Sequence, residues 1–150
     1  MRASVRAMVD VVSGSPGETE EIAARLAARL VAGDVVYVSG ELGSGKTTFV
    51  RGACRALGIE APVTSPTYVV GHRYDGVSHL DLYRFEQLTD ADWGALEPYF
   101  ADAIVFVEWP ERAAGRLPSP RVTVELEHVD VERRAVRLTS GDQGLLSGLI

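Results

Sequence analysis

The chain has 150 residues, of which 46% are apolar, and a formal net charge of −6. That length suits one domain with its own core, and the negative charge argues against a protein that grips nucleic acid over a broad basic face. No apolar run approaches the length of a membrane span. Because Cys54 is the only cysteine and no secretion leader is recognisable, we expect a protein of the reducing cytoplasm.

The first predicted helix begins at Ser15. Ser15, Pro16 and Glu18 form a typical start, with a side-chain cap, a proline in the first turn and a glutamate three residues after the cap. Apolar residues then recur every four positions as far as Leu30, and Gly33 is the expected end of the helix.

A strand, a glycine-rich loop and a second helix follow. Residues 35–38 form a short apolar run that suits a buried strand, and the sequence GELGSGKT occupies 40–47. Residues 47–57 place apolar side chains on one face and two arginines on the other, so we predict a helix there that Gly58 closes.

An antiparallel hairpin is predicted in the middle of the chain. Residues 68–74 and 77–82 have the character of strands, and Asp75-Gly76 between them is a strong signal for a two-residue turn. The stretch 87–100 predicts a weaker helix, because a glycine and a proline interrupt it.

The last part of the chain adds a central strand and a second hairpin. Residues 103–107 form an apolar run that suits a central strand, and this strand ends at Glu108. One or two helical turns are expected within 111–117. Residues 122–127 and 135–138 have the pattern of two paired strands.

No repeat, linker or low-complexity block divides the sequence. We therefore predict a single α/β domain over 1–150, with a core over about 15–139 and a loose tail over 141–150. Its central sheet should be mixed, with antiparallel hairpins added and helices on its flanks.

The run 40–47 matches the phosphate-binding loop of P-loop NTPases. Its small residues let successive backbone N–H groups face phosphates, and the helix that follows adds the positive end of its dipole. Lys46, the only lysine among 15 basic residues, would reach the outer phosphates, and the Thr47 hydroxyl would be a ligand of Mg²⁺. The predicted nucleotide-binding residues of the loop are Gly40, Glu41, Leu42, Gly43, Ser44, Gly45, Lys46, Thr47 and Thr48.

Two carboxylates are candidates for the acidic residues that phosphoryl transfer needs. Glu108 follows a buried strand, which would place it beside the loop as the acidic residue of a Walker B strand is placed. Asp81 follows another predicted strand and could lie near it. The alternative for either residue is a solvated carboxylate at the edge of a sheet.

Other polar residues allow more than one interpretation. Ser65 and Thr67 could sense a terminal phosphate, as switch segments do, or could belong to a plain turn. Arg84 could stabilise transition-state charge, although an arginine after Tyr83 more often packs or pairs. The three histidines lack the spacing of metal ligands, so we interpret them as structural; they are His72, His79 and His128.

Several segments in fixed order are more selective than the loop alone. They are GELGSGKTTFVRG at 40–52, LG at 57–58, SPTY at 65–68, HLDLYR at 79–84 and VEWPE at 107–111. Together they closely resemble the TsaE (YjeE) family of bacterial ATPases, which are needed to make threonylcarbamoyladenosine on the tRNA adenosine next to the anticodon. The resemblance extends from the helix near Ser15 to the last hairpin.

This resemblance implies ATP and Mg²⁺ as cofactors. It implies that Thr47 and Glu108 hold the metal and that Asp81 is catalytic, and Trp109 matches the Glu-Trp pair of the family. With Lys46 at the outer phosphates, the predicted catalytic residues are Asp81 and Lys46. It also implies a P-loop α/β domain with added antiparallel strands.

The resemblance further implies two protein partners, TsaD and TsaB, which carry out the threonylcarbamoyl transfer. The chain would then reach tRNA only indirectly and would not contact a membrane. In the family the adenine lies between an early segment and the C-terminal hairpin, which here suggests the stretch around Ser15 to Thr19 and, on the hairpin, Arg133. The surface near Tyr83, Arg84 and Trp109 is a candidate for partner docking.

Two other functions remain open on the sequence. A small-molecule kinase would use the same loop, but the acidic segment 86–97 contains no arginine for a phosphate-clamping lid. A non-catalytic adaptor could use ATP only to stabilise a binding surface. A GTPase is disfavoured, because the guanine-specific Asn-Lys-x-Asp motif is missing and the chain has no asparagine.

Overall fold

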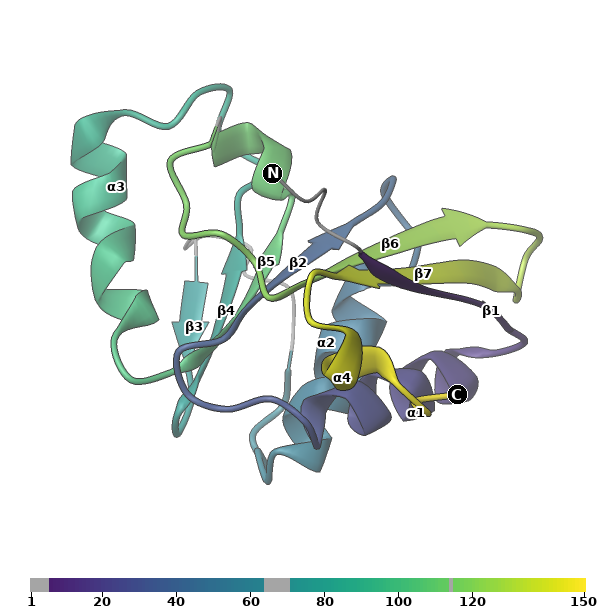
Figure 1. Ribbon diagram of the computed structural model, residues 1–150. Coiled ribbons are helices and arrows are strands. Elements are labelled where there is room, and N and C mark those ends of the chain that lie inside the picture. The colour runs from purple at the N-terminus through teal and green to yellow at the C-terminus, as the bar shows by residue number, and fades with distance from the viewer. Residues whose placement is uncertain (1–5, 64–70, 114) are drawn as a thin grey trace, which may run out of the picture.

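The computed structural model describes residues 6–63, 71–113 and 115–150 (Figure 1). Within these residues, seven strands form one sheet in the order β1-β7-β6-β2-β5-β4-β3. The strands are β1 (Ala7–Ser13), β2 (Val35–Ser39), β3 (Gly71–Arg73), β4 (Val77–Asp81), β5 (Ile104–Glu108), β6 (Val122–His128) and β7 (Arg134–Ser140). The helices are α1 (Pro16–Ala27), α2 (Lys46–Ala56), α3 (Asp90–Leu96) and α4 (Gln143–Leu146), with 3-10 turns η1 (Glu97–Phe100) and η2 (Pro110–Ala113).

The sheet is mixed, as predicted. Its centre is parallel, because β2 pairs with both β5 and β6 in parallel and β5 pairs with β4 in the same way. Antiparallel pairs extend it at both ends, β3 on β4 at one and β7 and β1 beyond β6 at the other. All five residues of β5 are buried, which is why that strand is a continuous apolar run before Glu108.

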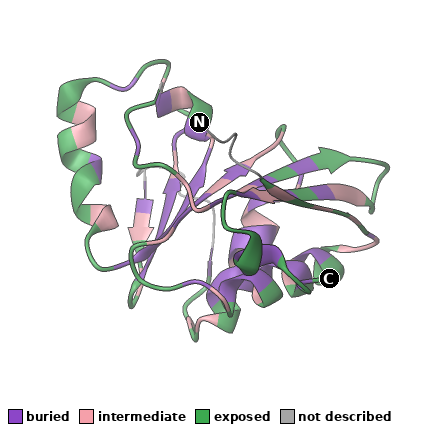
Figure 2. Ribbon diagram, in the orientation of Figure 1, coloured by how far each residue is buried: buried purple, intermediate pink, exposed green. Residues whose placement is uncertain are grey.

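Helices lie on both sides of the sheet. The helices α1, α2 and α4 cover one face, and α3 with η2 lies over the other face at the β5–β4–β3 end (Figure 1). Figure 2 shows that the central strands and the inner sides of α1 and α2 are buried, whereas most of α3 is exposed. The carboxyl ends of the central strands β2 and β5 lie next to the first turn of α2.

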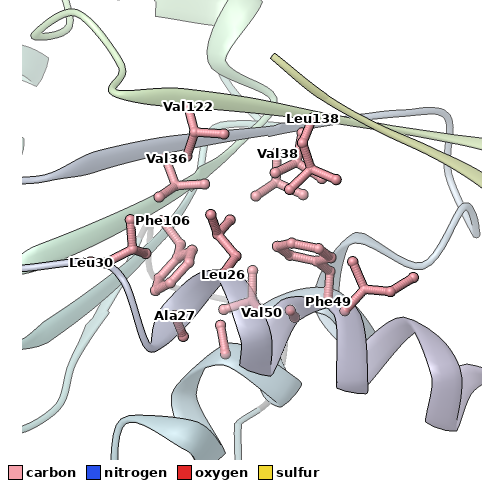
Figure 3. Packing of buried hydrophobic residues seen from close by; sticks show 14 of the residues in the cluster. Leu26, Ala27, Leu30, Val36, Val38, Phe49, Val50, Phe106, Val122 and Leu138 are labelled. Carbon is pink, nitrogen blue, oxygen red and sulfur yellow. The ribbon is translucent and has the colours of Figure 1, made fainter. Parts of the chain in front are cut away.

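The largest core cluster holds α2 against the sheet. Phe49 and Val50 of α2 and Leu26 of α1 are fully buried beneath Val38 and Phe106 of the central strands (Figure 3). Because these side chains are packed without water access, α2 has one position relative to β2 and β5. The residues at the start of α2 are consequently placed by the core.

Both predicted hairpins are present, although residues 68–70 of the strand predicted over 68–74 lie outside the described residues, and the predicted helix starts are present too. Tyr74 donates its backbone N–H to the carbonyl of Val77 at 2.7 Å, which closes the turn between β3 and β4. Ser15 caps α1 by accepting from the N–H of Glu18 at 3.2 Å. The weak helix predicted over 87–100 is α3 followed by η1; it starts only at Asp90, because Thr89 forms a capping box with Asp92.

The first helix is shorter than predicted. It ends at Ala27 instead of continuing to Gly33. Leu30 is buried all the same, and the N–H of Leu30 donates to the carbonyl of Ala27 at 3.1 Å in a turn that follows the helix. The regular spacing of apolar residues therefore predicted correctly that Leu30 is buried, but it did not predict that Leu30 lies outside the helix.

Both ends of the chain depart from the prediction. The strand β1 lies before the predicted core; its residues alternate between half-buried positions such as Val9 and Val11 and exposed ones such as Met8. The prediction of a loose tail over 141–150 is wrong, because Leu145, Leu146 and Leu149 are buried in the main core. A four-residue helix is too short to show a helical period, so the sequence pattern could not reveal it.

The tail is also held by hydrogen bonds. The Nη1 group of Arg29 donates to the carbonyls of Leu145 and Ser147 at 2.9 and 2.6 Å. Asp142 caps α4 and pairs with Arg121 at 3.0 Å. None of the helices in the described part of the chain is long and apolar enough to cross a bilayer.

The helices α1 and α2 cross at Gly52. A Cβ at this position would lie 2.5 Å from the Cα of Glu20, which is closer than atoms of two backbones can approach. The Glu20 carboxylate then pairs with Arg51 and Arg55 at 3.7 and 3.1 Å. The crossing therefore needs a residue without a side chain.

We expect Gly52→Ala to lower the free energy of unfolding by about 1–3 kcal/mol, because the added methyl group forces α1 away from α2. Gly94→Ala is the matched control: a Cβ there meets nothing within 4 Å, and alanine should stabilise α3 by about 0.5–1 kcal/mol. Denaturant unfolding measures both changes. Wild-type stability in Gly52→Ala would contradict the close crossing.

Candidate functional site

The loop between β2 and α2 passes very close to β6. Gly40, Gly43 and Gly45 have φ angles of 153°, 75° and 101°, which side-chain-bearing residues rarely adopt. A Cβ on Gly40 would lie 2.5 Å from the carbonyl oxygen of Leu126. Backbone strain and space thus both require the glycines that the motif predicts.

Lys46 is folded back over this loop. Its Nζ donates to the carbonyls of Gly40 and Glu41 at 2.7 and 2.8 Å, and it lies 4.5 Å from the centre of the Trp109 ring. Only 5% of the residue is exposed. Burial lowers the pKa of Lys46, and the carboxylates of Glu108 and Asp81, with that of Glu111, oppose this shift.

Of the other predicted loop residues, the first ones are open to solvent and the last ones are partly covered. Glu41, Leu42 and Gly43 are exposed, Thr47 and Thr48 are half-buried, and Ser44 is buried. No described residue hydrogen-bonds the Oγ of Ser44. The exposed part of the loop is therefore the part that can accept a ligand from outside.

Glu108 and Thr47 meet at the edge of the sheet. Glu108 is the last residue of β5 and is 2% exposed. The Thr47 hydroxyl can donate to its carboxylate, with distances of 3.2 and 3.4 Å to the two oxygens. Hydroxyl and carboxylate oxygens are the ligands that Mg²⁺ takes from proteins, and this ion usually needs only one or two of them beside phosphates and water. The pair fits that ion.

Asp81 stands next to Glu108 on the neighbouring strand. It ends β4 and is the register partner of Glu108 in the parallel pair. Its Oδ1 accepts the backbone N–H of Tyr83 at 3.0 Å. The structure thus brings four predicted site residues to one edge of the sheet, where the carboxyl ends of parallel strands form ligand sites in α/β folds.

His79, which the sequence analysis interpreted as structural, contacts a predicted site residue. It is fully buried, and its Nε2 contacts Oε2 of Glu108. The alternation in HLD, with His79 and Asp81 two positions apart, was the available signal, because alternate residues of a strand share a face. The other two histidines have no such contact: His72 lies on β3, and His128 is 3.5 Å from the carbonyl of Leu42.

An aromatic cluster adjoins Lys46. The rings of Tyr83 and Trp109 are 5.0 Å apart, and the guanidinium of Arg112 lies 5.5 and 5.6 Å from their centres. Trp109 follows Glu108 directly and has a φ of 58°, a strained value for a residue with a large side chain. Tyr83 is 43% exposed, and Arg84 is exposed beside it.

A cavity of about 350 Å³ adjoins the loop at Gly43 and Gly45. It is lined by Pro16, Thr19, Gly43, Gly45, Thr48, Val131, Glu132 and Arg134. These residues come from the start of α1, from the loop and α2, and from the turn between β6 and β7. Together they enclose the region in which the resemblance places an adenine.

Of the stretch 15–19 predicted for that region, Pro16 and Thr19 line the cavity, whereas Ser15 and Arg133 are not among its lining residues. Ser15 caps α1, and Arg133 pairs with Asp130 at 2.6 Å. Arg134 lines the cavity instead and donates to the carbonyl of Gly43 at 3.4 Å. Nothing in the sequence distinguishes two adjacent arginines at the end of a hairpin turn, of which Arg134 begins β7. Ser65 and Thr67 lie outside the described residues.

The chain is similar to one family over most of its length. The profile of the family described as "Threonylcarbamoyl adenosine biosynthesis protein TsaE" matches residues 13–136. The tRNA threonylcarbamoyladenosine biosynthesis protein TsaE of Bacillus subtilis is 35% identical over 130 residues, which cover 84% of this chain and 82% of that protein. The protein of the same name from Streptomyces coelicolor is 34% identical over 149 residues, which cover 85% of this chain and 99% of the other.

A solved structure has the same architecture. The crystal structure of YdiB from Bacillus subtilis superposes with a TM-score of 0.81 and 26% sequence identity, over 98% of this chain and 97% of the other. With the mixed sheet and flanking helices, this likeness confirms the predicted P-loop NTPase-like fold.

We expect Lys46→Ala to weaken the binding of a fluorescent ATP analogue by about 10- to 100-fold, since a hydrogen bond to a charged group is worth ~1.5–3 kcal/mol. Arg51→Ala is the control, because it removes a positive charge from the same helix on the side that faces Glu20. Near-normal affinity in a folded Lys46→Ala variant would mean that the phosphates do not lie on this loop.

Proposed function

Because the chain belongs to the TsaE family of threonylcarbamoyl adenosine biosynthesis proteins, we propose that it is a Mg²⁺-dependent ATPase that drives this tRNA modification. In this proposal the chain binds the TsaD–TsaB transfer complex, and its ATP hydrolysis drives the reaction cycle of that complex. The chain does not contact the modified adenosine itself.

The observation that carries the proposal is the meeting of Lys46, Thr47 and Glu108 at one edge of the sheet. The backbone N–H groups of the glycine-rich loop would receive the phosphates, and Lys46 would leave its two carbonyl partners for phosphate oxygens. Thr47 and Glu108 would hold Mg²⁺, which neutralises charge on the phosphates when bound. Such an arrangement serves phosphoryl transfer by position and electrostatics.

Asp81 is the proposed partner of the attacking water. It ends the strand next to Glu108, so its carboxylate lies at the same edge of the sheet as the metal ligands. Phosphoryl transfer needs a residue there that orients the nucleophile. The cavity beside Gly43 and Thr48 would take the nucleoside, because it opens directly from the loop.

The aromatic cluster supports control by a partner. Tyr83 is exposed, Trp109 touches it, and the Trp109 ring in turn contacts the Lys46 ammonium. Exposed aromatic and arginine side chains are the residue types that anchor interfaces. A partner that binds Tyr83 and Trp109 would therefore act on the lysine that the phosphates need.

We expect cells depleted of this protein to lose threonylcarbamoyladenosine from their tRNA. The wild-type chain and Arg51→Ala should restore the modification, and Lys46→Ala should not, because it lacks the phosphate contact. Mass spectrometry of nucleosides from hydrolysed tRNA gives the measurement. Unchanged modification after depletion would remove the pathway assignment.

We also expect the purified chain to hydrolyse ATP slowly, well below ~1 s⁻¹, because the segment 86–97 offers no arginine for a lid that would exclude water and stabilise the transferring phosphoryl group. Adding TsaD and TsaB should change the rate, and Trp109→Ala should remove this response. Trp93→Ala, an indole on α3, is the control. Fast hydrolysis that ignores both the partners and Trp109 would favour the kinase alternative, and binding without any turnover would favour the adaptor.

A further inference from the structure

An imidazole is buried inside the sheet next to the proposed metal site. His79 is 0% exposed and lies between Phe106 of β5 and His72 of β3 in the register of the sheet. A polar ring in such a place costs stability unless its nitrogen atoms find partners. Among the described residues its only hydrogen-bond partner is the Glu108 carboxylate, through Nε2, and its Nδ1 has none.

The Glu108 carboxylate depends on few donors. Its Oε1 has the Thr47 hydroxyl at 3.4 Å, and its Oε2 has that hydroxyl at 3.2 Å together with the His79 ring. The contacts to Thr47 are long for bonds between a hydroxyl and a carboxylate. His79 is therefore the main restraint on rotation of the carboxylate about its last bond.

The acceptor character of the carboxylate determines the tautomer of the ring. An ionised carboxylate only accepts hydrogen bonds, so a ring nitrogen in contact with Glu108 must carry the proton. In a neutral ring the other nitrogen, Nδ1, is then a bare acceptor, which agrees with its lack of a described partner. Opposite an ionised Glu108, His79 is therefore an Nε2–H donor.

We propose that His79 is a positioning residue: its Nε2–H orients the Glu108 carboxylate toward the Mg²⁺ that Glu108 and Thr47 would hold. The inference rests on the proposed ATPase and adds to it a residue that touches neither nucleotide nor metal. Hydrogen bonds that orient the ligands of a metal commonly raise its affinity by 10- to 100-fold. The competing explanation is that the His79 ring only fills space on the face of the sheet that it shares with Phe106 and Glu108.

The first test reads the hydrogen bond itself. The chain has three histidines, so long-range ¹H–¹⁵N NMR spectra of the protein without nucleotide or metal resolve each ring. We expect His79 as the Nε2–H tautomer and expect its Nε2 signal to move in Glu108→Gln. An Nδ1–H tautomer, or an unchanged Nε2 signal in that variant, would overturn the inference.

The second test separates positioning from packing. His79→Gln keeps an N–H near the place of Nε2, whereas His79→Leu keeps the bulk and loses the donor. Mg²⁺ tightens ATP binding by a certain factor, and we expect this factor to be about tenfold smaller in His79→Leu than in wild type. The ATP affinity of His79→Leu in EDTA should stay within about twofold of the wild-type value. His79→Gln should recover most of that factor.

Ser78→Ala is the matched control for a buried change in the same strand. Ser78 is fully buried on the opposite face and donates to the carbonyl of Tyr99 at 2.7 Å. Its loss should lower stability and leave the Mg²⁺ factor unchanged. An equal loss of the factor in Ser78→Ala and His79→Leu would show that strand packing alone is responsible.

The outcomes also separate this inference from the proposed function. A wild-type chain whose affinity for ATP ignores Mg²⁺ would overturn the proposed metal site. A full Mg²⁺ effect in folded His79→Leu would overturn the positioning role alone. If His79→Leu does not fold, His79→Gln and the NMR spectra decide.

Discussion

The structure around the site depends on one buried negative charge. Glu108 is 2% exposed at the end of a strand that is buried throughout, and an ionised carboxylate there is costly unless donors and a cation face it. The donors come from Thr47 on α2 and His79 on β4, and Lys46 is the cation. The burial of Glu108 therefore requires that α2, β4 and β5 are correctly placed relative to one another.

The core provides that register. The buried residues of β5 lie between β2 and β4, and the Phe49 side chain keeps the first turn of α2 above the same strands. Gly52 lets α1 approach α2 closely, and the C-terminal leucines close the same face of the sheet. Packing thus determines where Lys46 and Thr47 begin the helix, and a change in the distant core would reach the site through α2.

Local patterns predicted much of this architecture. The glycine-rich loop, the Asp75-Gly76 turn and the apolar run before Glu108 are each short local patterns, and they placed Thr47, Asp81 and Glu108 on the right elements. What the sequence could not show depends on contacts between distant segments. Arg29 anchors the C-terminal leucines across more than a hundred residues, and the contact between His79 and Glu108 joins two strands whose residues are 29 positions apart in the sequence.

The central claim is that Glu108 takes part in binding Mg²⁺ beside ATP. The most direct measurement is the ATP affinity of Glu108→Gln with and without Mg²⁺, since the amide keeps the shape of the side chain and loses its charge. The account predicts that the factor by which Mg²⁺ raises the ATP affinity is at least about tenfold smaller in Glu108→Gln than in wild type. The ATP affinity measured in EDTA should be nearly the same in the two proteins. A wild-type Mg²⁺ effect in folded Glu108→Gln would contradict it.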